Sequence, residues 1–270
     1  MHAFKVLALT IPRIAKVFSG GSVLSFNDLL LRLWYFAVSR KSYKRGLPMK
    51  FSFQYEKKIF DVTLHSPADL AVLDEVFIQK EYAWALPFSP QIIIDLGAHF
   101  GDTALYYHAT YPDAKIIALE PSPQTYARLC LNVKEIEQIV PVQAGIAEKD
   151  GVKELYIGPS SIGDSFSHRS GTTMTVSVPV YTLRSLLDMY AVERADLVKF
   201  DIEGAEELLF QSEDPSSMAR AYIGEVHSDL MSISDSDFLK YFREFDIQTE
   251  ALKNKKRMIV RGLLKSDETF

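Results

Sequence analysis

Cysteine is almost absent from this chain of 270 residues, and Cys130 is the only one. A single cysteine excludes both an internal disulfide framework and a cysteine-based zinc site. A lone thiol is typical of proteins in a reducing compartment, so we expect a cytoplasmic protein.

Long apolar runs are also missing. No stretch reaches the ~20 apolar residues that a transmembrane helix needs, and the nearest candidate, residues 29–38, is interrupted by Arg32. Near the N-terminus, the apolar residues 6–11 are followed at once by Arg13 and Lys16, whereas a signal peptide needs a longer apolar centre. We therefore expect neither a membrane span nor a signal peptide.

The chain has no excess of basic residues. It carries 30 Lys and Arg against 35 Asp and Glu, a formal net charge of -5. Proteins that bind nucleic acid or anionic membranes by charge usually present a basic surface. The balance therefore argues against a nucleic-acid partner.

Two regions differ in their patterns. Residues 1–50 read as a helical N-terminal extension followed by a charged linker, and residues 51–270 as the main domain. Within the main domain, apolar residues alternate over 51–64 as in a β-hairpin, and Leu70, Leu73, Val76 and Phe77 share one face of a predicted helix.

From residue 91 onward, predicted strands and helices alternate. The expected strands are 92–94, 115–119, 139–142, 197–200, 221–226, 246–251 and 256–263; the expected helices are 103–110, 122–133, 183–190, 205–211 and 238–245. This alternation predicts an α/β fold, a Rossmann-like, mostly parallel sheet with helices on both faces. Residues 150–180 break the rhythm and read as a β insertion, whose loop 158–172 is either a lid over the substrate or a flexible insertion.

A glycine turn follows the first strand of this alternation. Residues 95–101 read DLGAHFG, in which Gly97 permits a tight turn and Gly101 lets the next helix start close to the strand. A dinucleotide turn would read G-x-G-x-x-G, whereas this one reads G-x-x-x-G. Asp95 would repel a pyrophosphate but suits the positive groups of S-adenosylmethionine (SAM), so SAM is the expected ligand.

Glu120 ends the second strand, 19 residues after Gly101. An acidic residue at this place accepts hydrogen bonds from ribose hydroxyls in nucleotide-binding βαβ units. We therefore expect Glu120 to bind the ribose of the cofactor.

Four phrases together resemble the FkbM family of SAM-dependent methyltransferases. They are DLGAHFGDTA from residue 95, ALEPSP from 118, LVKFDIEGAE from 197 and GEVH from 224. The resemblance covers about residues 64–230 and implies a class I methyltransferase fold with SAM as cofactor. It also implies methylation of hydroxyl oxygens, typically on natural products or saccharides. Position by position, it assigns the cofactor to Asp95, Gly97, Ala98, His99, Gly101, Asp102, Thr103, Glu120, Pro121, Gly145 and Ile146. His99 stands where the family often has asparagine.

Candidate catalytic residues lie at the ends of two later strands. Asp201 and Glu203 follow one strand, and Glu225 and His227 end the next, two apart and so on one face. If these strands are neighbours, the four side chains converge beside the methyl group. A hydroxyl acceptor must lose its proton, and we expect His227 or Asp201 to act as general base, with Glu203 shaping the site.

Other uses of these residues remain open. The same cluster could hold Mg²⁺ or Mn²⁺, but its spacing matches no recognisable metal motif, so we expect no metal. Lys199 interrupts an apolar strand, and we expect a structural ion pair with Glu225 or Asp201. The competing functions are a SAM-binding module without catalysis and a nicotinamide-dependent oxidoreductase.

Overall fold

The computed structural model describes residues 11, 12, 14, 48–158, 166, 174–211, 214–252 and 257–265. Most of the predicted N-terminal extension, residues 1–50, and most of the loop 158–172 lie outside these ranges. Among the described residues, no helix is long and apolar enough to cross a membrane.

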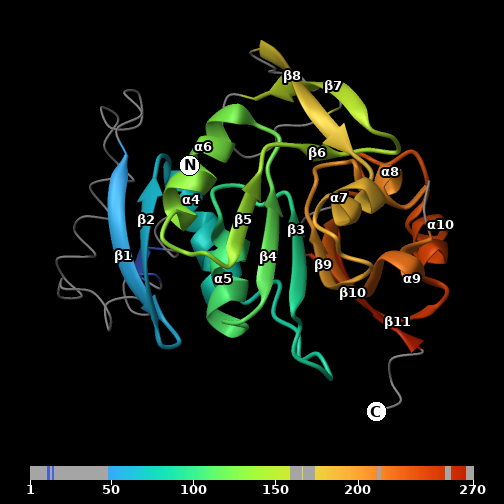
Figure 1. The fold of residues 1–270 in the computed structure, drawn as a ribbon, viewed down its shortest axis with the longest axis horizontal. Coiled ribbons are helices and arrows are strands. Elements are labelled where there is room, and N and C mark those ends of the chain that lie inside the picture. The colour runs from blue at the N-terminus through green and yellow to red at the C-terminus, as the bar shows by residue number, and fades with distance from the viewer. Residues whose placement is uncertain are drawn as a thin grey trace.

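A seven-stranded sheet forms the centre of the part of the chain that the structure describes (Figure 1). From one edge to the other its strands are β5 (Ile139–Val142), β4 (Lys115–Leu119), β3 (Ile92–Leu96), β9 (Ala195–Phe200), β10 (Ala219–Val226), β12 (Met258–Leu264) and β11 (Phe245–Ala251). The first five are parallel, and β12 is antiparallel to both of its neighbours. The predicted Rossmann-like α/β sheet is therefore confirmed.

The strand order reverses between β3 and β9. The chain passes from β3 outward to β4 and β5, then returns to β9 on the other side of β3. Leu96 pairs with Phe200 at the ends of these two strands, so the residues that follow each strand lie side by side. Ligands of open α/β sheets bind in the crevice outside the carboxyl ends of the strands at such a reversal.

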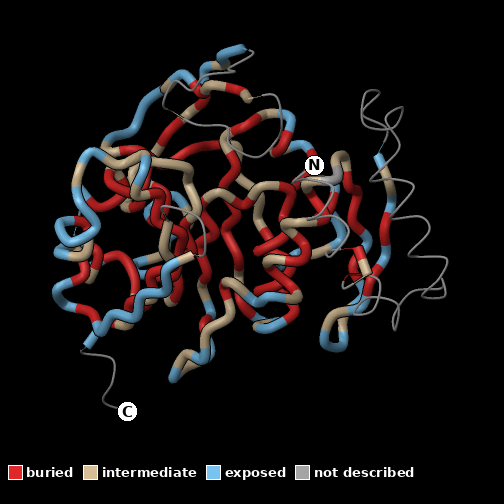
Figure 2. The backbone as a smooth tube through the Cα atoms, turned by 180° about the vertical axis from the view of Figure 1, so that it is seen from behind, coloured by how far each residue is buried: buried red, intermediate tan, exposed pale blue. Residues whose placement is uncertain are grey.

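Both faces of the sheet are buried. Ile93 belongs to one apolar core and its neighbour Ile94 to the other, because successive strand residues point to opposite faces. The same holds for Ile116 and Ile117. Figure 2 shows the central strands buried along most of their length. Burial on both faces explains why these strands read as continuous apolar runs rather than as alternating patterns.

Helices from two parts of the chain cover the two faces (Figure 1). One core includes side chains from α5 (Asp102–Thr110), α6 (Pro123–Val133), α4 (Pro67–Leu73) and the π-helical turn η2 (Asp74–Ile78), together with the hairpin β1 (Met49–Tyr55) and β2 (Lys58–Leu64). The other includes side chains from α7 (Leu183–Met189), α8 (Glu206–Gln211), α9 (Pro215–Met218) and α10 (Asp235–Phe238). The predicted hairpin and the buried helix face at residues 70–77 are both confirmed.

A small second sheet forms the β insertion. It comprises β6 (Gly145–Ile146), β8 (Met174–Tyr181) and β7 (Gly151–Ile157), with β7 and β8 antiparallel. This confirms the insertion predicted from the glycine-separated pieces of residues 150–180.

The predicted helix over residues 238–245 is wrong in its extent. Helix α10 ends at Phe238, a 3-10 turn (Leu239–Phe242) follows, and Phe245 already begins β11. The aromatic residues that gave the helical spacing pack into one cluster, although they do not lie on a single helix. Phe242 and Phe245 both pack against Tyr222, each with ring centroids 5.6 Å apart.

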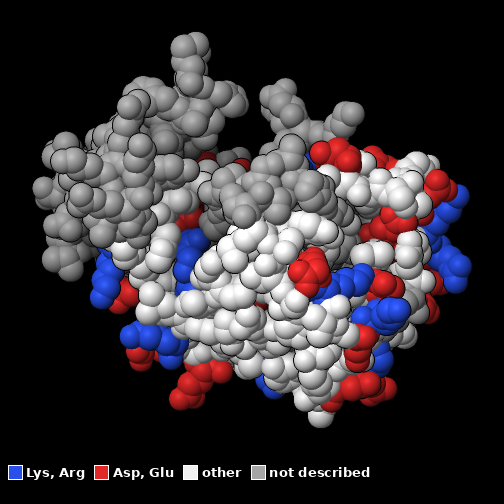
Figure 3. All heavy atoms as spheres, turned by 90° about the horizontal axis from the view of Figure 1, so that it is seen from above, with Lys and Arg blue, Asp and Glu red and all other residues white. Residues whose placement is uncertain are grey.

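The surface charges are mixed. In the face seen in Figure 3, the described acidic and basic side chains are interspersed. This distribution agrees with the nearly balanced composition and differs from the continuous basic surface typical of nucleic-acid binding.

Candidate active site

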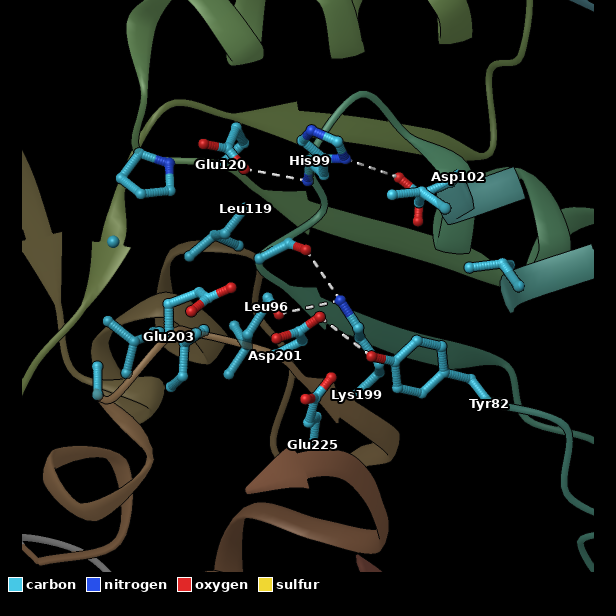
Figure 4. Close-up of a pocket in the computed structure, with 18 of the residues that line it drawn as sticks. Tyr82, Leu96, His99, Asp102, Leu119, Glu120, Lys199, Asp201, Glu203 and Glu225 are labelled. Atoms are coloured by element: carbon cyan, nitrogen blue, oxygen red, sulfur yellow. Dashed lines mark hydrogen bonds and ion pairs between the residues drawn. The ribbon is translucent and has the colours of Figure 1, made fainter. Parts of the chain in front are cut away.

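A cavity lies at the carboxyl ends of β3, β9 and β10, where the strand order reverses. Figure 4 shows His99, Asp102 and Glu120 on one side of it and Asp201, Glu203 and Glu225 on the other. The predicted site residues in its wall are Gly97, His99, Asp102, Glu120, Pro121, Gly145, Ile146, Asp201 and Glu203. The cavity at the reversal of strand order is therefore also the place where most of the predicted site residues lie.

Two glycines give the turn its shape. Gly97 has a φ of +78°, and a Cβ there would lie 1.9 Å from the carbonyl oxygen of Asp201. Gly101 is the N-cap of α5 with a φ of +99°, and its missing side chain leaves room for Leu129 and Val133 of α6. Both positions combine a left-handed backbone with a close contact, so each requires glycine.

Buried polar side chains hold the glycine turn in place. Asp95 accepts a hydrogen bond from the Thr103 hydroxyl (2.7 Å) and pairs with Lys199 at 3.1 Å. Lys199 also donates to the carbonyl of Gly97 at 2.8 Å (Figure 4). Burial lowers the pKa of Lys199, but the charge of Asp95 more than compensates, so the net pKa is raised and the amine stays cationic. The expected partners of Lys199, Glu225 and Asp201, are thus corrected to Asp95 and the turn itself.

Four of the residues that were expected to contact the cofactor do not line the cavity. Asp95, Ala98 and Thr103 are almost wholly buried, and none of them is in the cavity wall. Gly101 is not in the wall either. These four residues hold the turn in shape, whereas Gly97, His99 and Asp102 face the space where a ligand fits.

His99 has the left-handed backbone that asparagine and histidine tolerate better than most residues, with a φ of 48°. Its backbone N–H donates to Oε2 of Glu120 (3.0 Å), and its Nδ1 lies 3.5 Å from Asp102 (Figure 4). Burial lowers the pKa of His99, but Asp102 and Asp69 together raise it above its ordinary value. Its buried Nε2 makes no hydrogen bond with any described residue.

Glu120 is held in a fixed orientation. Besides the bond from His99, its Oε1 accepts the backbone N–H of Ser122 at 2.9 Å. An ionised carboxylate only accepts hydrogen bonds, which suits the hydroxyls of a ribose. The adjoining Pro121 also lines the cavity.

The other end of the cavity is apolar. Ile146, Leu155 and Phe166 line it beside Gly145. A Cβ on Gly145 would lie 2.4 Å from the ring of Phe166, so glycine here allows that ring to approach the backbone. The sequence offered no signal for Phe166, because it lies inside a loop without a pattern.

The four predicted catalytic side chains do converge. Nε2 of His227 lies 3.4 Å from Glu203, 3.7 Å from Asp201 and 3.9 Å from Glu225. Asp201 and Glu203 follow β9, and Glu225 and His227 lie at the end of β10, which pairs with β9 in parallel. Glu203 has a left-handed φ of 52°, a strained conformation of the kind that clusters at functional sites.

His227 is separated from the cavity. Its side chain is completely buried, it is not in the cavity wall, and its Nδ1 lies 2.6 Å from the equally buried Glu206. Burial lowers the pKa of His227, but Glu206 and then Asp201 and Glu203 raise it to about 9. The imidazole is therefore protonated at neutral pH.

Two further residues of this region were not predicted. The Tyr82 hydroxyl donates to Oδ2 of Asp201 at 3.1 Å, and Arg257 donates to Glu225 at 2.9 Å. Burial raises the pKa of Asp201, but Lys199, His227, Tyr82 and Arg257 bring it below its ordinary value. Tyr82 lies in a turn and Arg257 directly precedes β12, and the sequence carries no recognisable motif at either place.

The cavity as a whole fits SAM. Its apolar side suits a purine, the Glu120 carboxylate suits ribose hydroxyls, and the Asp102 carboxylate suits the ammonium of the amino-acid end. Gly97 lines the cavity without a side chain, so a ligand can approach the backbone of the turn.

Comparison with known proteins identifies the family of this chain. Residues 95–247 match the family described as the methyltransferase FkbM domain. Methyltransferase sdnD of Sordaria araneosa is 30% identical over 169 residues, which cover 50% of this chain and 65% of that protein. Methyltransferase 1 of Beauveria bassiana (strain ARSEF 2860) is 30% identical over 156 residues, 49% of this chain and 62% of that protein. The chain therefore spans slightly less than two thirds of the length of these relatives.

Solved structures align at low identity. Aeropyrum pernix fibrillarin in complex with natively bound S-adenosyl-L-methionine is 14% identical with a TM-score of 0.46, covering 79% of this chain and 82% of that chain. A fibrillarin pre-rRNA processing protein of Methanococcus jannaschii is 12% identical with a TM-score of 0.47, covering 80% and 82%.

Proposed function

Because this chain belongs to the FkbM methyltransferase family, whose methyl donor is SAM, we propose that it methylates a hydroxyl oxygen of a small molecule or saccharide. One observation carries the proposal. The carboxylate of Asp201 lines the cavity directly beside the Gly97 turn, where it can take the proton of a hydroxyl acceptor. We further propose that residues 51–270 form the catalytic domain.

The cofactor has a proposed place in this cavity. The adenine would lie between Gly145, Ile146 and Phe166, with the ribose on Glu120 and Pro121 beside it. His99 and Asp102 would bind the methionine end. When bound, SAM supplies an already activated methyl group, so the protein's main task is alignment.

Asp201 is the better placed of the two predicted bases. Its side chain is 30% exposed and lines the cavity, whereas that of His227 is 0% exposed and lies behind it. We therefore propose that Asp201 accepts the hydroxyl proton and that His227, held by Glu206, positions the carboxylates. Tyr82 fixes the Asp201 carboxylate through its hydrogen bond.

Glu203 narrows the same end of the cavity. It lies on the loop after β9 with its carboxylate on the cavity side (Figure 4). A polar, carboxylate-lined end suits an acceptor with several hydroxyl groups, because each hydroxyl can donate to an acidic oxygen. This supports a polyhydroxylated acceptor such as a saccharide.

The decisive experiment measures transfer from labelled SAM to a panel of hydroxylated compounds and saccharides, with the product identified by mass spectrometry and NMR. We expect an O-methyl product, and a kcat lower by about 10²–10⁴ for Asp201→Asn, the usual size of a general-base contribution. Binding of S-adenosylhomocysteine should persist in that variant. Asp188→Asn, a change on the exposed side of α7, is the matched control and should leave kcat unchanged.

Two outcomes would contradict the proposal. Methylation only on nitrogen would exclude the hydroxyl acceptor, and SAM binding without turnover on any compound would favour a SAM-binding module without catalysis.

A further inference from the structure

We propose that Asp201, Glu225 and His227 bind a divalent metal ion at the acceptor end of the cavity. The proposed role of the ion in catalysis rests on the proposed hydroxyl methylation. The binding of the ion does not, because it depends only on the site. One ligand atom of each side chain lies within 4.8 Å of the others. They come from the loop after β9 and from the end of β10, two adjacent strands of the rigid sheet.

The strongest observation is the free ring nitrogen of His227. The side chain is completely buried, yet its Nε2 makes no hydrogen bond with any described residue. This nitrogen faces Asp201, Glu203 and Glu225. A buried nitrogen that faces several carboxylate oxygens without bonding to them has the arrangement of a metal ligand.

Glu206 supplies the support that metal-binding histidines usually have. Its Oε1 lies 2.6 Å from Nδ1 of His227, and both side chains are fully buried. A carboxylate on one ring nitrogen fixes the tautomer and directs the other nitrogen to the metal. Glu206 is itself fixed, because it accepts the backbone N–H of Gly204 at 3.0 Å.

The separations fit an ion better than hydrogen bonds. Nε2 of His227 lies 3.7 Å from Oδ1 of Asp201 and 3.9 Å from Oε1 of Glu225. Both distances are too long for a hydrogen bond. Ligand atoms that share one ion lie roughly 3–4 Å apart, because each is about 2.0–2.2 Å from the metal.

The local charges also favour a cation. Four carboxylates, of Asp201, Glu203, Glu206 and Glu225, lie within 4 Å of the His227 ring. Arg257 pairs with Glu225 and Glu203, and Lys199 pairs with Asp95. Acidic groups therefore outnumber cations here, and a divalent ion would reduce that excess. One imidazole and two carboxylates suit a first-row ion such as Mn²⁺.

Such an ion would help the proposed reaction. A hydroxyl bound to a divalent ion has a much lower pKa than a free one, as water does when it binds zinc. Oδ1 of Asp201 faces His227, while Oδ2 faces the Tyr82 hydroxyl. Oδ1 can thus bind the ion while Oδ2 accepts the hydroxyl proton. The acceptor oxygen then bonds to the methyl carbon as the carbon–sulfur bond breaks, and the proton leaves from Asp201 to solvent.

The test measures Mn²⁺ binding to the chelator-treated full chain, by the electron paramagnetic resonance of free Mn²⁺ and by calorimetry, without any acceptor. We expect one ion per chain. His227→Asn and Asp201→Asn should weaken binding by at least tenfold, and Glu206→Gln by about 10–100-fold, the usual effect of losing an outer partner. Asp246→Asn, on the exposed strand β11, is the control and should bind as the native chain does.

The contrary results are equally definite. A native chain that binds no Mn²⁺ at millimolar concentration overturns the proposal and leaves His227 and Arg257 as the cations that pair with these carboxylates. Equal binding by His227→Asn and by the control overturns it as well. If the variants do not fold, the native chain alone decides, since a specifically bound ion raises its melting temperature and removal by chelator reverses the rise.

These outcomes remain separate from the hydroxyl proposal. If the chain binds no Mn²⁺ and still methylates a hydroxyl after complete chelation, the metal-site proposal is overturned and the hydroxyl proposal stands. Stoichiometric Mn²⁺ binding by a chain that methylates only nitrogen overturns the hydroxyl acceptor alone.

Discussion

Gly97 and Asp201 are in contact although 103 residues separate them in the sequence, because they follow the paired strands β3 and β9. A Cβ on Gly97 would lie 1.9 Å from the carbonyl oxygen of Asp201. The cofactor turn and the proposed catalytic carboxylate thus share one backbone contact, and a displacement of either one moves the other.

Gly97→Ala should therefore destabilise the protein and abolish binding of S-adenosylhomocysteine. The left-handed backbone alone costs about 1–2 kcal/mol for a residue with a Cβ, before the overlap with Asp201 is counted. Thermal unfolding and calorimetry measure the two effects. Gly151→Ala is the matched control, because a Cβ there meets no atom within 4 Å. Equal stability of the two variants would contradict the role given to this contact.

The sheet and the general place of the site could be predicted from the sequence. Residues 115–119 and 139–142 are strands with the predicted limits. The first is buried on both faces and so reads as an apolar run. Asp201 and His227 were expected to meet because adjacent parallel strands end at the same edge, and they do. These inferences needed only local patterns and the rules of parallel sheets.

Contacts between distant segments could not be predicted. Lys199 was assigned to Glu225 or Asp201, but it pairs with Asp95, which lies opposite it on the neighbouring strand β3. Tyr82, Phe166 and Arg257 come from segments without periodicity, so nothing marked them as neighbours of the site. Which side chain fills a gap depends on three-dimensional packing, and a linear pattern does not carry that information.

The buried pair of Asp69 and Arg128 should make stability depend on acid pH. Burial raises the pKa of Asp69. Arg128, His99 and a backbone N–H lower it by a larger amount, so the net pKa lies below its ordinary value. A carboxyl whose pKa is lower in the folded state than in the unfolded state stabilises the folded protein. This contribution is complete at a pH above the unfolded pKa, about 3.9. It is lost as the pH falls through the folded pKa. Urea unfolding between pH 7 and pH 3 should show the loss.

Asp69→Asn tests the same pair directly. The Oδ2 atom of Asp69 lies 2.6 Å from Arg128, and both side chains are buried. We expect the free energy of unfolding at pH 7 to fall by about 3–5 kcal/mol, because a buried charge is left unpaired. The fall in stability below pH 4 should be shallower than in the native chain. Asp188→Asn removes the exposed pair with Arg184 and should change stability by at most about 1 kcal/mol.

The left-handed backbone of His99 should decide which substitutions the turn accepts. Asparagine adopts this conformation readily, whereas a β-branched residue does so only with strain. His99→Asn should keep the native stability, and His99→Val should lose about 1–2 kcal/mol. Denaturant unfolding of the two variants measures the difference. Equal losses would indicate that the ring contacts of His99, and not its backbone, set the stability of the turn.

Glu120→Gln should weaken cofactor binding without unfolding the chain. The carboxylate accepts the backbone N–H groups of His99 and Ser122 through its two oxygens, and an amide keeps only one acceptor oxygen. The loss of a charged hydrogen bond to the ribose corresponds to about 1.5–3 kcal/mol, at least a tenfold weaker affinity for S-adenosylhomocysteine. Adenosine should lose the same factor and methionine none, because only the first contains the ribose. Glu154→Gln, on the exposed strand β7, is the control, and an unchanged affinity for adenosine in Glu120→Gln would exclude the ribose contact.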